Sequence, residues 1–291
     1  MSLENVRIIN LPKIIDRRGN LSFIESENHI PFSIERSHWI YDVPGGVARG
    51  GHAYRQTQEF IVAMSGSFDV VVSDGISQKT FHLNRSYYGL YIPAGVWREM
   101  NNFSTNSLAL ILSSTLYDPD DYIWEKDELH QRSDAERNTP GLKESSYIVP
   151  EGDITSVFDC SMIEFDKHLN DCGNLTVVEN KRNIPFTCRR AYYLYDVPGG
   201  ESRGAHAHKE LQQLIIAVGG SFDVTVNDGL NTRTVSLNHP YRGLLLPPGI
   251  WREITNFSSG ATCLVLASDL YDESDYLREY NDFLKFKSCP K

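Results

Sequence analysis

The segment Tyr41-Asp-Val-Pro-Gly-Gly46 occurs a second time as Tyr195-Asp-Val-Pro-Gly-Gly200, 154 positions later. The same offset carries Trp97-Arg-Glu99 onto Trp251-Arg-Glu253, and no insertion or deletion is needed between these anchors. A period this long indicates duplicated domains, because the units of solenoid proteins span about 20–50 residues. The chain is therefore one module written twice, and each copy must fold around a core of its own.

The length and composition exclude several classes of protein. The chain has 291 residues, enough for two domains, and no stretch approaches the ~18 consecutive apolar residues of a membrane-spanning helix. Acidic residues outnumber basic residues by 38 to 28, so the overall field repels nucleic acid but allows a local basic pocket for one small phosphorylated ligand. The first residues lack the layout of a secretory signal. We expect a cytoplasmic protein with neither a membrane nor a nucleic acid as partner.

Short apolar runs predict an all-β architecture. Residues 67–72 place Phe68, Val70 and Val72 on one face and run into Ser73-Asp-Gly75, a tight-turn signal. Further short runs at 108–112, 244–246 and 263–266 are flanked by Gly, Pro or Asn. Many short strands of this kind are typical of a sandwich or barrel.

The ends of the copies have a different pattern. Residues 272–285 space aromatic side chains at helical intervals after acidic residues, which predicts a short closing helix in each copy. A polar, charged stretch separates the copies. We expect barrel 1 at residues 1–130, a linker at 131–154 and barrel 2 at 155–291.

Two histidines in the second copy indicate chemistry. In Arg203-Gly-Ala-His-Ala-His208, His206 and His208 are two residues apart at the start of an expected strand, so their imidazoles point the same way. Paired histidines on a barrel wall indicate metal binding or acid–base work. The first copy has His52-Ala-Tyr54 at the same place.

This spacing resembles the cupin motif, in which three histidines and one glutamate bind a metal. Here the glutamate position falls on Gln212 or Gln213, and Arg252 replaces the third histidine, with Arg98 matching it in the first copy. Glu59 stands in the first copy where Gln213 stands in the second. A guanidinium is always protonated and cannot ligate a metal. We therefore expect two tandem cupin (double-stranded β-helix, or jelly-roll) barrels without a metal.

The second-copy motifs R-G-x-H-A-H-K, G-S-F-D-V, W-R-E and L-Y-D-E-x-D-Y are similar to those of the sugar 3,4-ketoisomerase family of cupins. The resemblance covers nearly all of both copies. It implies an isomerase that needs no cofactor and moves the carbonyl of dTDP-4-keto-6-deoxyglucose from C4 to C3 through an enediol. This reaction lies on the way to 3-amino-3,6-dideoxy sugars.

The resemblance also implies roles for the paired residues. It implies that His206 and His208 are the acid–base pair and that Arg252 faces the sugar ring. It does not assign which histidine donates a proton and which accepts one. His52, Tyr54 and Arg98 are the catalytic candidates of the first copy. Because a tyrosine with a pKa near 10 is a poor base, we expect that copy to be weak or inactive.

Further residues are candidates for binding the substrate. The family's D-x-R-G-x-L segment has Arg18 at its arginine in the first copy and Cys172 there in the second, which leaves the stereochemistry of the product open. The remaining candidates are basic or aromatic: Arg203 and Lys209 for the diphosphate, Arg49 as the repeat equivalent of Arg203, Arg190, and Tyr193 for stacking on the base.

Single-copy members of this family resemble dimers that exchange N-terminal strands, so the duplication implies an intrachain pseudo-dimer of barrels and leaves a homodimer open. Three other functions remain. One is a cupin 3,5-epimerase of dTDP-4-keto sugars, and another is a non-catalytic nucleotide-sugar-binding module. The least favoured is a metal-dependent dioxygenase, because Arg98 and Arg252 occupy ligand positions.

Overall fold

The computed structural model describes residues 3–130, 150–168 and 170–288, which form two compact units. Each unit is assembled from discontinuous segments. Within the described residues, unit 1 contains 3–11, 27–130 and 167–185, and unit 2 contains 12–26, 150–166 and 186–288. Each unit is thus mostly one copy of the repeat, completed by a short segment from the other copy. The linker expected at 131–154 lies mostly outside the described residues.

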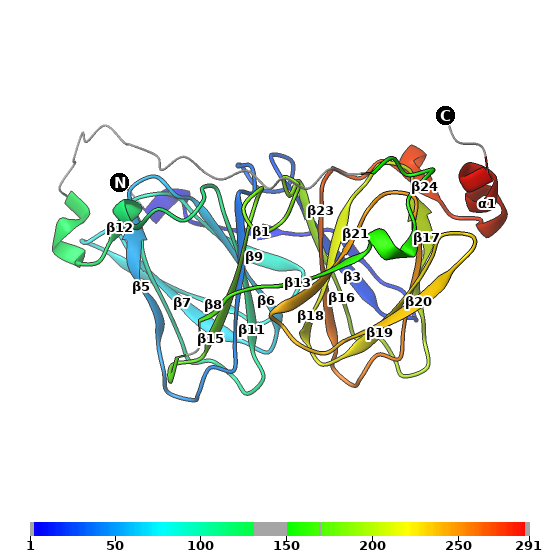
Figure 1. Ribbon diagram of the computed structural model, residues 1–291. Coiled ribbons are helices and arrows are strands. Elements are labelled where there is room, and N and C mark those ends of the chain that lie inside the picture. The colour runs from blue at the N-terminus through cyan, green and yellow to red at the C-terminus, as the bar shows by residue number, and fades with distance from the viewer. Residues whose placement is uncertain (1–2, 131–149, 169, 289–291) are drawn as a thin grey trace. The chain divides into compact units, whose positions relative to one another are not determined.

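Unit 1 consists of two antiparallel sheets (Figure 1). The strand orders are β1-β9-β6-β11-β4-β15-β14 and β12-β5-β10-β7-β8. The strands are β1 Arg7–Asn10, β4 Arg36–Tyr41, β5 Arg49–Tyr54, β6 Glu59–Ser65, β7 Phe68–Ser73, β8 Gln78–Leu83, β9 Tyr88–Ile92, β10 Trp97–Asn101, β11 Leu108–Ser113, β12 Tyr122–Ile123, β14 Lys167–His168 and β15 Asn174–Glu179.

Unit 2 repeats this topology, with the orders β13-β21-β18-β23-β16-β3-β2 and β20-β19-β22-β17-β24. The strands are β2 Lys13–Ile14, β3 Asn20–Glu25, β13 Ser161–Glu164, β16 Arg190–Tyr195, β17 Arg203–His208, β18 Gln213–Gly219, β19 Phe222–Asn227, β20 Thr232–Leu237, β21 Arg242–Leu246, β22 Trp251–Thr255, β23 Thr262–Ala267 and β24 Tyr276–Leu277. The single α-helix of the described chain is α1, Tyr280–Ser288.

One strand of each unit comes from the other copy. Strand β3 pairs along its whole length with β16, and its Leu21 and Phe23 pack against the core of unit 2. In unit 1, β15 pairs in the same way with β4, and Leu175 packs against that core. The two copies therefore exchange equivalent strands.

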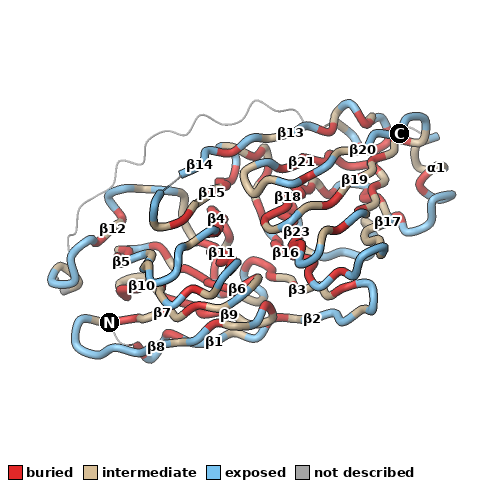
Figure 2. Tube along the Cα trace, turned by 90° about the horizontal axis from the view of Figure 1, so that it is seen from below, coloured by how far each residue is buried: buried red, intermediate tan, exposed pale blue. Residues whose placement is uncertain are grey.

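Alternating side chains fill each barrel. In β7, Phe68, Val70 and Val72 are buried while Asp69 and Val71 are partly exposed, as a strand with one face toward the core requires. Buried residues concentrate along the strands and exposed residues at the connections (Figure 2). The predicted all-β class and the tandem barrels are confirmed, and the four predicted strand segments coincide with strands except at residue 67, which precedes β7.

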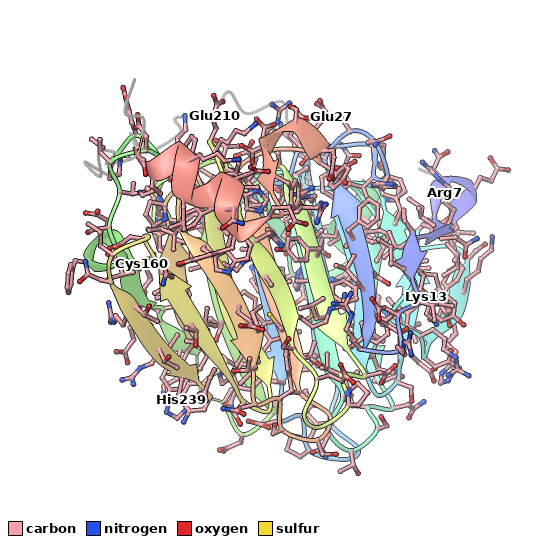
Figure 3. All side chains as sticks on the ribbon, turned by 90° about the vertical axis from the view of Figure 1, so that its right-hand side faces the viewer. Arg7, Lys13, Glu27, Cys160, Glu210 and His239 are labelled. Carbon is pink, nitrogen blue, oxygen red and sulfur yellow. The ribbon has the colours of Figure 1, made fainter. Side chains whose placement is uncertain are left out.

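The closing helix begins later than its sequence pattern predicts. Asp272 caps a 3-10 turn, Glu273–Asp275, by accepting from the backbone N–H of Ser274, and α1 starts only at Tyr280. Phe283 of α1 is fully buried in a cluster with Ala207 and Leu277. Figure 3, which looks onto unit 2, shows α1 lying against the strands.

In the first copy, the equivalent segment begins as a 3-10 helix, Lys126–His130, and the chain beyond it lies outside the described residues. No helix within the described ranges is long and apolar enough to cross a membrane.

Candidate active site

Strands β17 and β22 hold the paired histidines of unit 2 beside an arginine. His206 is the register partner of Arg252, and the ladder is irregular between Arg203 and His206. The His206 and His208 ring centroids are 5.0 Å apart in an edge-on contact, so the two imidazoles share one face as predicted. Tyr276 of β24 contacts both rings.

A carboxylate fixes the orientation of His208. The Nδ1 atom of His208 lies 2.9 Å from Oδ2 of Asp275, whose Oδ1 accepts from the backbone N–H of Glu210 at 2.7 Å. Because the carboxylate can only accept, Nδ1 carries the proton and Nε2 keeps its lone pair. The amide Nε2 of Gln213 lies 3.3 Å from that lone pair and donates to it. The geometry leaves His208 as a neutral imidazole with a basic Nε2.

The pKa values agree with this protonation state. Burial lowers the pKa of His208 to about 4, although the hydrogen bond with Asp275 acts in the opposite direction. Burial raises the pKa of Asp275, but the hydrogen bonds from His208 and from backbone N–H groups outweigh it and leave that pKa below its ordinary value. At neutral pH the pair is therefore an imidazole and a carboxylate.

Arg252 is a buried cation with neutral neighbours. Its Nη1 lies 2.9 Å from Nδ1 of His206, its Nη2 donates to the Tyr192 hydroxyl at 3.2 Å and its Nε to Oε1 of Gln213 at 3.3 Å. Its Nη1 also donates to the carbonyl of Gly204. Within the described structure, all the atoms that accept hydrogen bonds from Arg252 are therefore uncharged. The positive charge of Arg252 thus stays available to a ligand.

Arg252 also decides the tautomer of His206. A guanidinium can only donate, so Nδ1 of His206 accepts and its proton sits on Nε2. Within the described residues, this buried Nε2 has no hydrogen-bond partner. Burial and the charge of Arg252 hold the pKa of His206 well below its usual value. The site therefore places an N–H donor, at His206, beside the Nε2 acceptor of His208, which the Gln213 amide contacts at 3.3 Å.

The strand exchange decides which barrel receives the D-x-R-G-x-L arginine. Arg18 belongs to unit 2, where its partner Asp16 interacts electrostatically with Arg203, and Arg203 donates to the carbonyl of Gly19 at 2.5 Å. Cys172 belongs to unit 1, where it interacts electrostatically with Arg49. The barrel with the histidine pair therefore carries the arginine of this segment.

The other expected ligand contacts are placed differently. Lys209 is exposed and donates to the carbonyl of Ser274 at 2.6 Å. Arg190 is buried over the rings of Tyr192 and Tyr271, and its Nε and Nη2 lack partners among the described residues. Tyr193 is fully buried but points to the face of β16 opposite Tyr192. The structure brings Tyr192 to the histidines and leaves Tyr193 away from them.

The equivalent site of unit 1 is chemically different. Arg98 donates to both carboxylate oxygens of Glu59, at 2.8 and 3.1 Å, and both side chains are buried. The Tyr54 hydroxyl donates to that of Tyr122 at 3.3 Å, and burial raises the pKa of Tyr54 well above 10. Burial and Arg98 lower the pKa of His52 to about 2. Unit 1 therefore has a neutralised arginine, and Tyr54 stands at the position equivalent to His208.

The described parts of the two barrels can be compared with the cupin metal site. Among the described residues, no group of three or more His, Cys, Asp or Glu side chains is arranged to hold a metal ion. In unit 2 the cupin ligand positions hold Arg252 and Gln213, and Nδ1 of His206 already accepts from Arg252. This donor set suits proton transfer rather than metal coordination.

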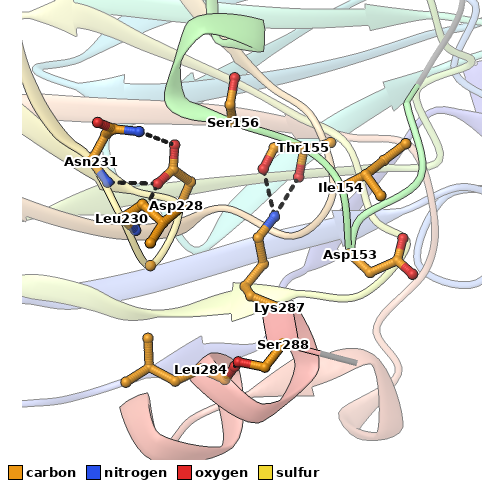
Figure 4. Close-up of a pocket in the computed structure, with 11 residues that line it drawn as sticks. Asp153, Ile154, Thr155, Ser156, Asp228, Leu230, Asn231, Leu284, Lys287 and Ser288 are labelled. Carbon is orange, nitrogen blue, oxygen red and sulfur yellow. Dashed lines mark hydrogen bonds between the residues drawn. The ribbon is translucent and has the colours of Figure 1, made fainter. Parts of the chain in front are cut away.

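A pocket of about 420 Å³ lies elsewhere in unit 2, between residues 153–156, the turn 228–231 and α1 (Figure 4). Lys287 donates there to the carbonyls of Gly152 at 3.0 Å and Thr155 at 2.5 Å. None of its lining residues belongs to the histidine cluster. These hydrogen bonds tie α1 to the start of the second copy.

The fold and site together define a tandem cupin with an acid–base site in one barrel. The family described as "FdtA: WxcM-like, C-terminal" matches residues 4–133 and again 158–288, and the chain belongs to this family. A curated relative, the TDP-4-oxo-6-deoxy-alpha-D-glucose-3,4-oxoisomerase of Aneurinibacillus thermoaerophilus, is 42% identical over 125 residues, which are 43% of this chain and 90% of the relative. The predicted family and enzyme class, an isomerase, are confirmed.

Solved structures give similar matches. A 3,4-ketoisomerase from Helicobacter canadensis is 44% identical to this chain, with a TM-score of 0.44. The match covers 45% of this chain and 98% of the Helicobacter chain. A sugar 3,4-ketoisomerase from Thermoanaerobacterium thermosaccharolyticum, solved with TDP, is 36% identical and covers 45% of this chain and 96% of its own, with a TM-score of 0.45.

Proposed function

We propose that unit 2 catalyses the 3,4-ketoisomerisation of a dTDP-4-keto-6-deoxyhexose. The observation that carries the proposal is the His208–Asp275 pair, which leaves a basic Nε2 beside the N–H of His206 and the charge of Arg252. The curated relative is named for this reaction and is 42% identical over one copy. The reaction oxidises C3 and reduces C4 of the same sugar, so it needs no external oxidant or reductant.

In the first step, Nε2 of His208 removes the proton from C3. The electron pair of that C–H bond forms the C3–C4 double bond, and the carbonyl oxygen on C4 takes up a proton from Nε2 of His206. Arg252 stabilises the negative charge that develops on this oxygen, and Asp275 stabilises the imidazolium of His208. The product of the step is an enediol.

In the second step, the hydroxyl on C3 loses its proton and becomes the new carbonyl, while C4 receives a proton. The His206 ring, deprotonated in the first step, is suited to accept the hydroxyl proton, and the imidazolium of His208 is suited to deliver one to carbon. Both histidines return to their starting states. The resulting 3-keto sugar presents its carbonyl where an amino group can be introduced, so we place the reaction before amination at C3.

For the nucleotide, we propose contacts at the rim of unit 2. Arg203 is half-buried, and Arg18 lies beside it on the exchanged segment, so guanidinium donors are available to a diphosphate. Lys209 is exposed at the end of β17. The exchanged strands β3 and β15 support a further proposal: the chain is an intrachain pseudo-dimer of two sequence copies, 1–130 and 155–291, joined by a linker at 131–154.

The test is NMR of the purified full chain with dTDP-4-keto-6-deoxyglucose in D2O. We expect a 3-keto product, with deuterium at C4 in proportion to the exchange of the His208 imidazolium proton with solvent before it is delivered to carbon. His206→Asn and His208→Asn should abolish its formation, whereas His52→Asn, the repeat counterpart of His206→Asn, should not. Deuterium at C5 without a carbonyl shift would indicate a 3,5-epimerase, and binding without turnover would indicate a binding module.

A further inference from the structure

Unit 1 carries an aromatic platform at the place of its degenerate site. Tyr122 and Trp124 are stacked, with ring centroids 5.0 Å apart and planes 13° from parallel. Trp124 is 60% exposed, so the ring face turned away from Tyr122 is open to a ligand. In unit 2 the repeat position of Trp124 is Arg278, so the platform is specific to unit 1. A flat, exposed indole suits stacking against a sugar ring or a nucleobase.

His52 lies directly beside this platform. Its ring centroid is 4.8 Å from that of Tyr122 and 5.4 Å from that of Trp124. The residue is more than nine-tenths buried, and within the described residues its ring nitrogens have, beyond a weak interaction with the backbone of Gly50 that raises the pKa of His52, no hydrogen bond of good geometry. A buried polar group without a partner is costly, and a ligand hydroxyl or carbonyl would supply one. His52 therefore offers one donor and one acceptor next to the aromatic rings.

The charges around this site favour an anion at the rim and an uncharged group inside. Glu59 neutralises Arg98 within the barrel. Arg49, which precedes His52 on β5, is half-buried, and burial lowers its pKa. Its counterpart Arg203 lies near Asp16, whereas the repeat position of Asp16 in the other copy is the uncharged Asn170. Arg49 is thus a desolvated rim cation, for which a phosphate is a favourable partner.

We propose that unit 1 binds a second nucleoside diphosphate sugar without converting it, with the diphosphate at Arg49 and a ring against Trp124 and His52. This inference rests on the proposed ligand class of unit 2. Turnover is excluded because Tyr54 stands where His208 provides the base, and its hydroxyl already donates to Tyr122. Unit 1 is therefore a ligand site, and the chain carries two sites of which one is catalytic.

Equilibrium binding of TDP to the full chain, measured by isothermal titration calorimetry, tests the proposal. We expect two TDP molecules per chain for the wild type. The double variant Arg49→Ala/Trp124→Ala should bind one, and Arg203→Ala should weaken the other site at least 10-fold. Ile76→Ala is the control, because it removes an apolar side chain that is 87% exposed on the same unit, and it should leave both sites intact.

Each outcome separates this inference from the proposed function. One TDP per chain in the wild type, lost in Arg203→Ala and unaffected by Arg49→Ala/Trp124→Ala, overturns the second site and leaves the ketoisomerase proposal standing. Absence of TDP binding to either unit overturns both. Quenching of Trp124 fluorescence by TDP in a His208→Asn background, absent in Trp124→Phe, supports a site in unit 1 directly.

Discussion

His208 Nδ1 lies 2.9 Å from Asp275 Oδ2, whereas the repeat equivalents of these two residues, Tyr54 and Asp121, make no such pair. Asp121 instead accepts from the backbone N–H groups of Gln56 and Thr57, at 2.8 and 3.0 Å. The same carboxylate position thus orients His208, the proposed base, in one barrel and accepts from two backbone N–H groups in the other. The two units therefore differ in the group that could transfer a proton at this position.

Asp275→Asn is expected to lower kcat about 100-fold or more with little change in KM. An amide can donate to Nδ1 of His208, which stabilises the tautomer whose Nε2 is protonated and unable to act as a base, and a positioned base contributes about 10²–10⁴-fold. The check is steady-state kinetics across pH 6–9 for Asp275→Asn and for Asp121→Asn, its repeat counterpart. Equal losses in the two variants would contradict the role of Asp275 in orienting His208.

Gln213→Glu is expected to lower kcat at least 10-fold. The new carboxylate would pair with Arg252 as Glu59 pairs with Arg98, so the charge that stabilises the enolate oxygen would be neutralised. Single-turnover kinetics, combined with TDP affinity, separates lost chemistry from lost binding. Unchanged single-turnover rates would show that the charge of Arg252 does not act in the reaction.

Glu59→Gln, the reciprocal change, is expected to destabilise the protein by about 3 kcal/mol, because it leaves Arg98 as a buried charge without its carboxylate. Urea unfolding of Glu59→Gln and of the double variant Glu59→Gln/Arg98→Met measures this. The double variant should regain part of the stability, since it removes the uncompensated charge. A double variant less stable than Glu59→Gln would contradict this explanation.

Part of this architecture follows from sequence alone, because it depends on local patterns. The repeat identifies two equivalent folds, period-2 alternation identifies strands such as β7, and two-residue spacing puts His206 and His208 on one face. The replacement of a metal-ligand position by Arg252 is equally local. Each of these signals lies within a few residues along the chain.

Other features depend on tertiary contacts that no local pattern records. Both copies contain equivalent strands for the exchanged segment to pair with. Local sequence therefore does not decide whether the segment that carries Arg18 joins the barrel of the first copy or that of the second. Asp275 lies 67 residues beyond His208, inside a stretch whose acidic residues resemble a helix start. Every residue of β16 is buried, so alternation could not distinguish Tyr192 from Tyr193.

Stability is expected to fall as the pH decreases from about 7 to 5. Burial lowers the pKa of four histidines below the ordinary value of 6.5: His38, His52, His206 and His208. Below pH 6.5 the unfolded chain therefore binds protons that the folded chain does not, and this stability is lost as the pH falls toward the folded pKa values, about 4 for His208. Each such proton contributes a slope of ~1.4 kcal/mol per pH unit.

Urea unfolding measured between pH 7 and 5 checks this slope, because carboxylates titrate mainly below this pH range. His52→Gln should reduce it by about one proton, whereas Ile76→Ala, at an exposed position without a titratable group, should not change it. A stability that is flat over this range would contradict the neutral state of the buried histidines.

Gly19→Ala is expected to reduce kcat/KM about 10-fold or more, although Gly19 belongs to the sequence of the first copy. Gly19 has φ +115°, and a Cβ there would lie 2.6 Å from Cγ2 of Val197, while its carbonyl accepts from Arg203. The substitution therefore strains the rim of unit 2, at a cost of about 1–3 kcal/mol.

Gly173 is the matched control in unit 1. It has φ +107°, and a Cβ there would lie 2.8 Å from Cγ2 of Val43, so Gly173→Ala imposes a comparable strain on the barrel without the histidine pair. We expect Gly173→Ala to lower the urea midpoint much as Gly19→Ala does but to leave kcat/KM unchanged. The two glycines hold equivalent repeat positions. A loss of activity in Gly173→Ala, but not in Gly19→Ala, would mean that each copy contributes this segment to its own barrel. A loss in Gly19→Ala alone is what the exchanged strands require.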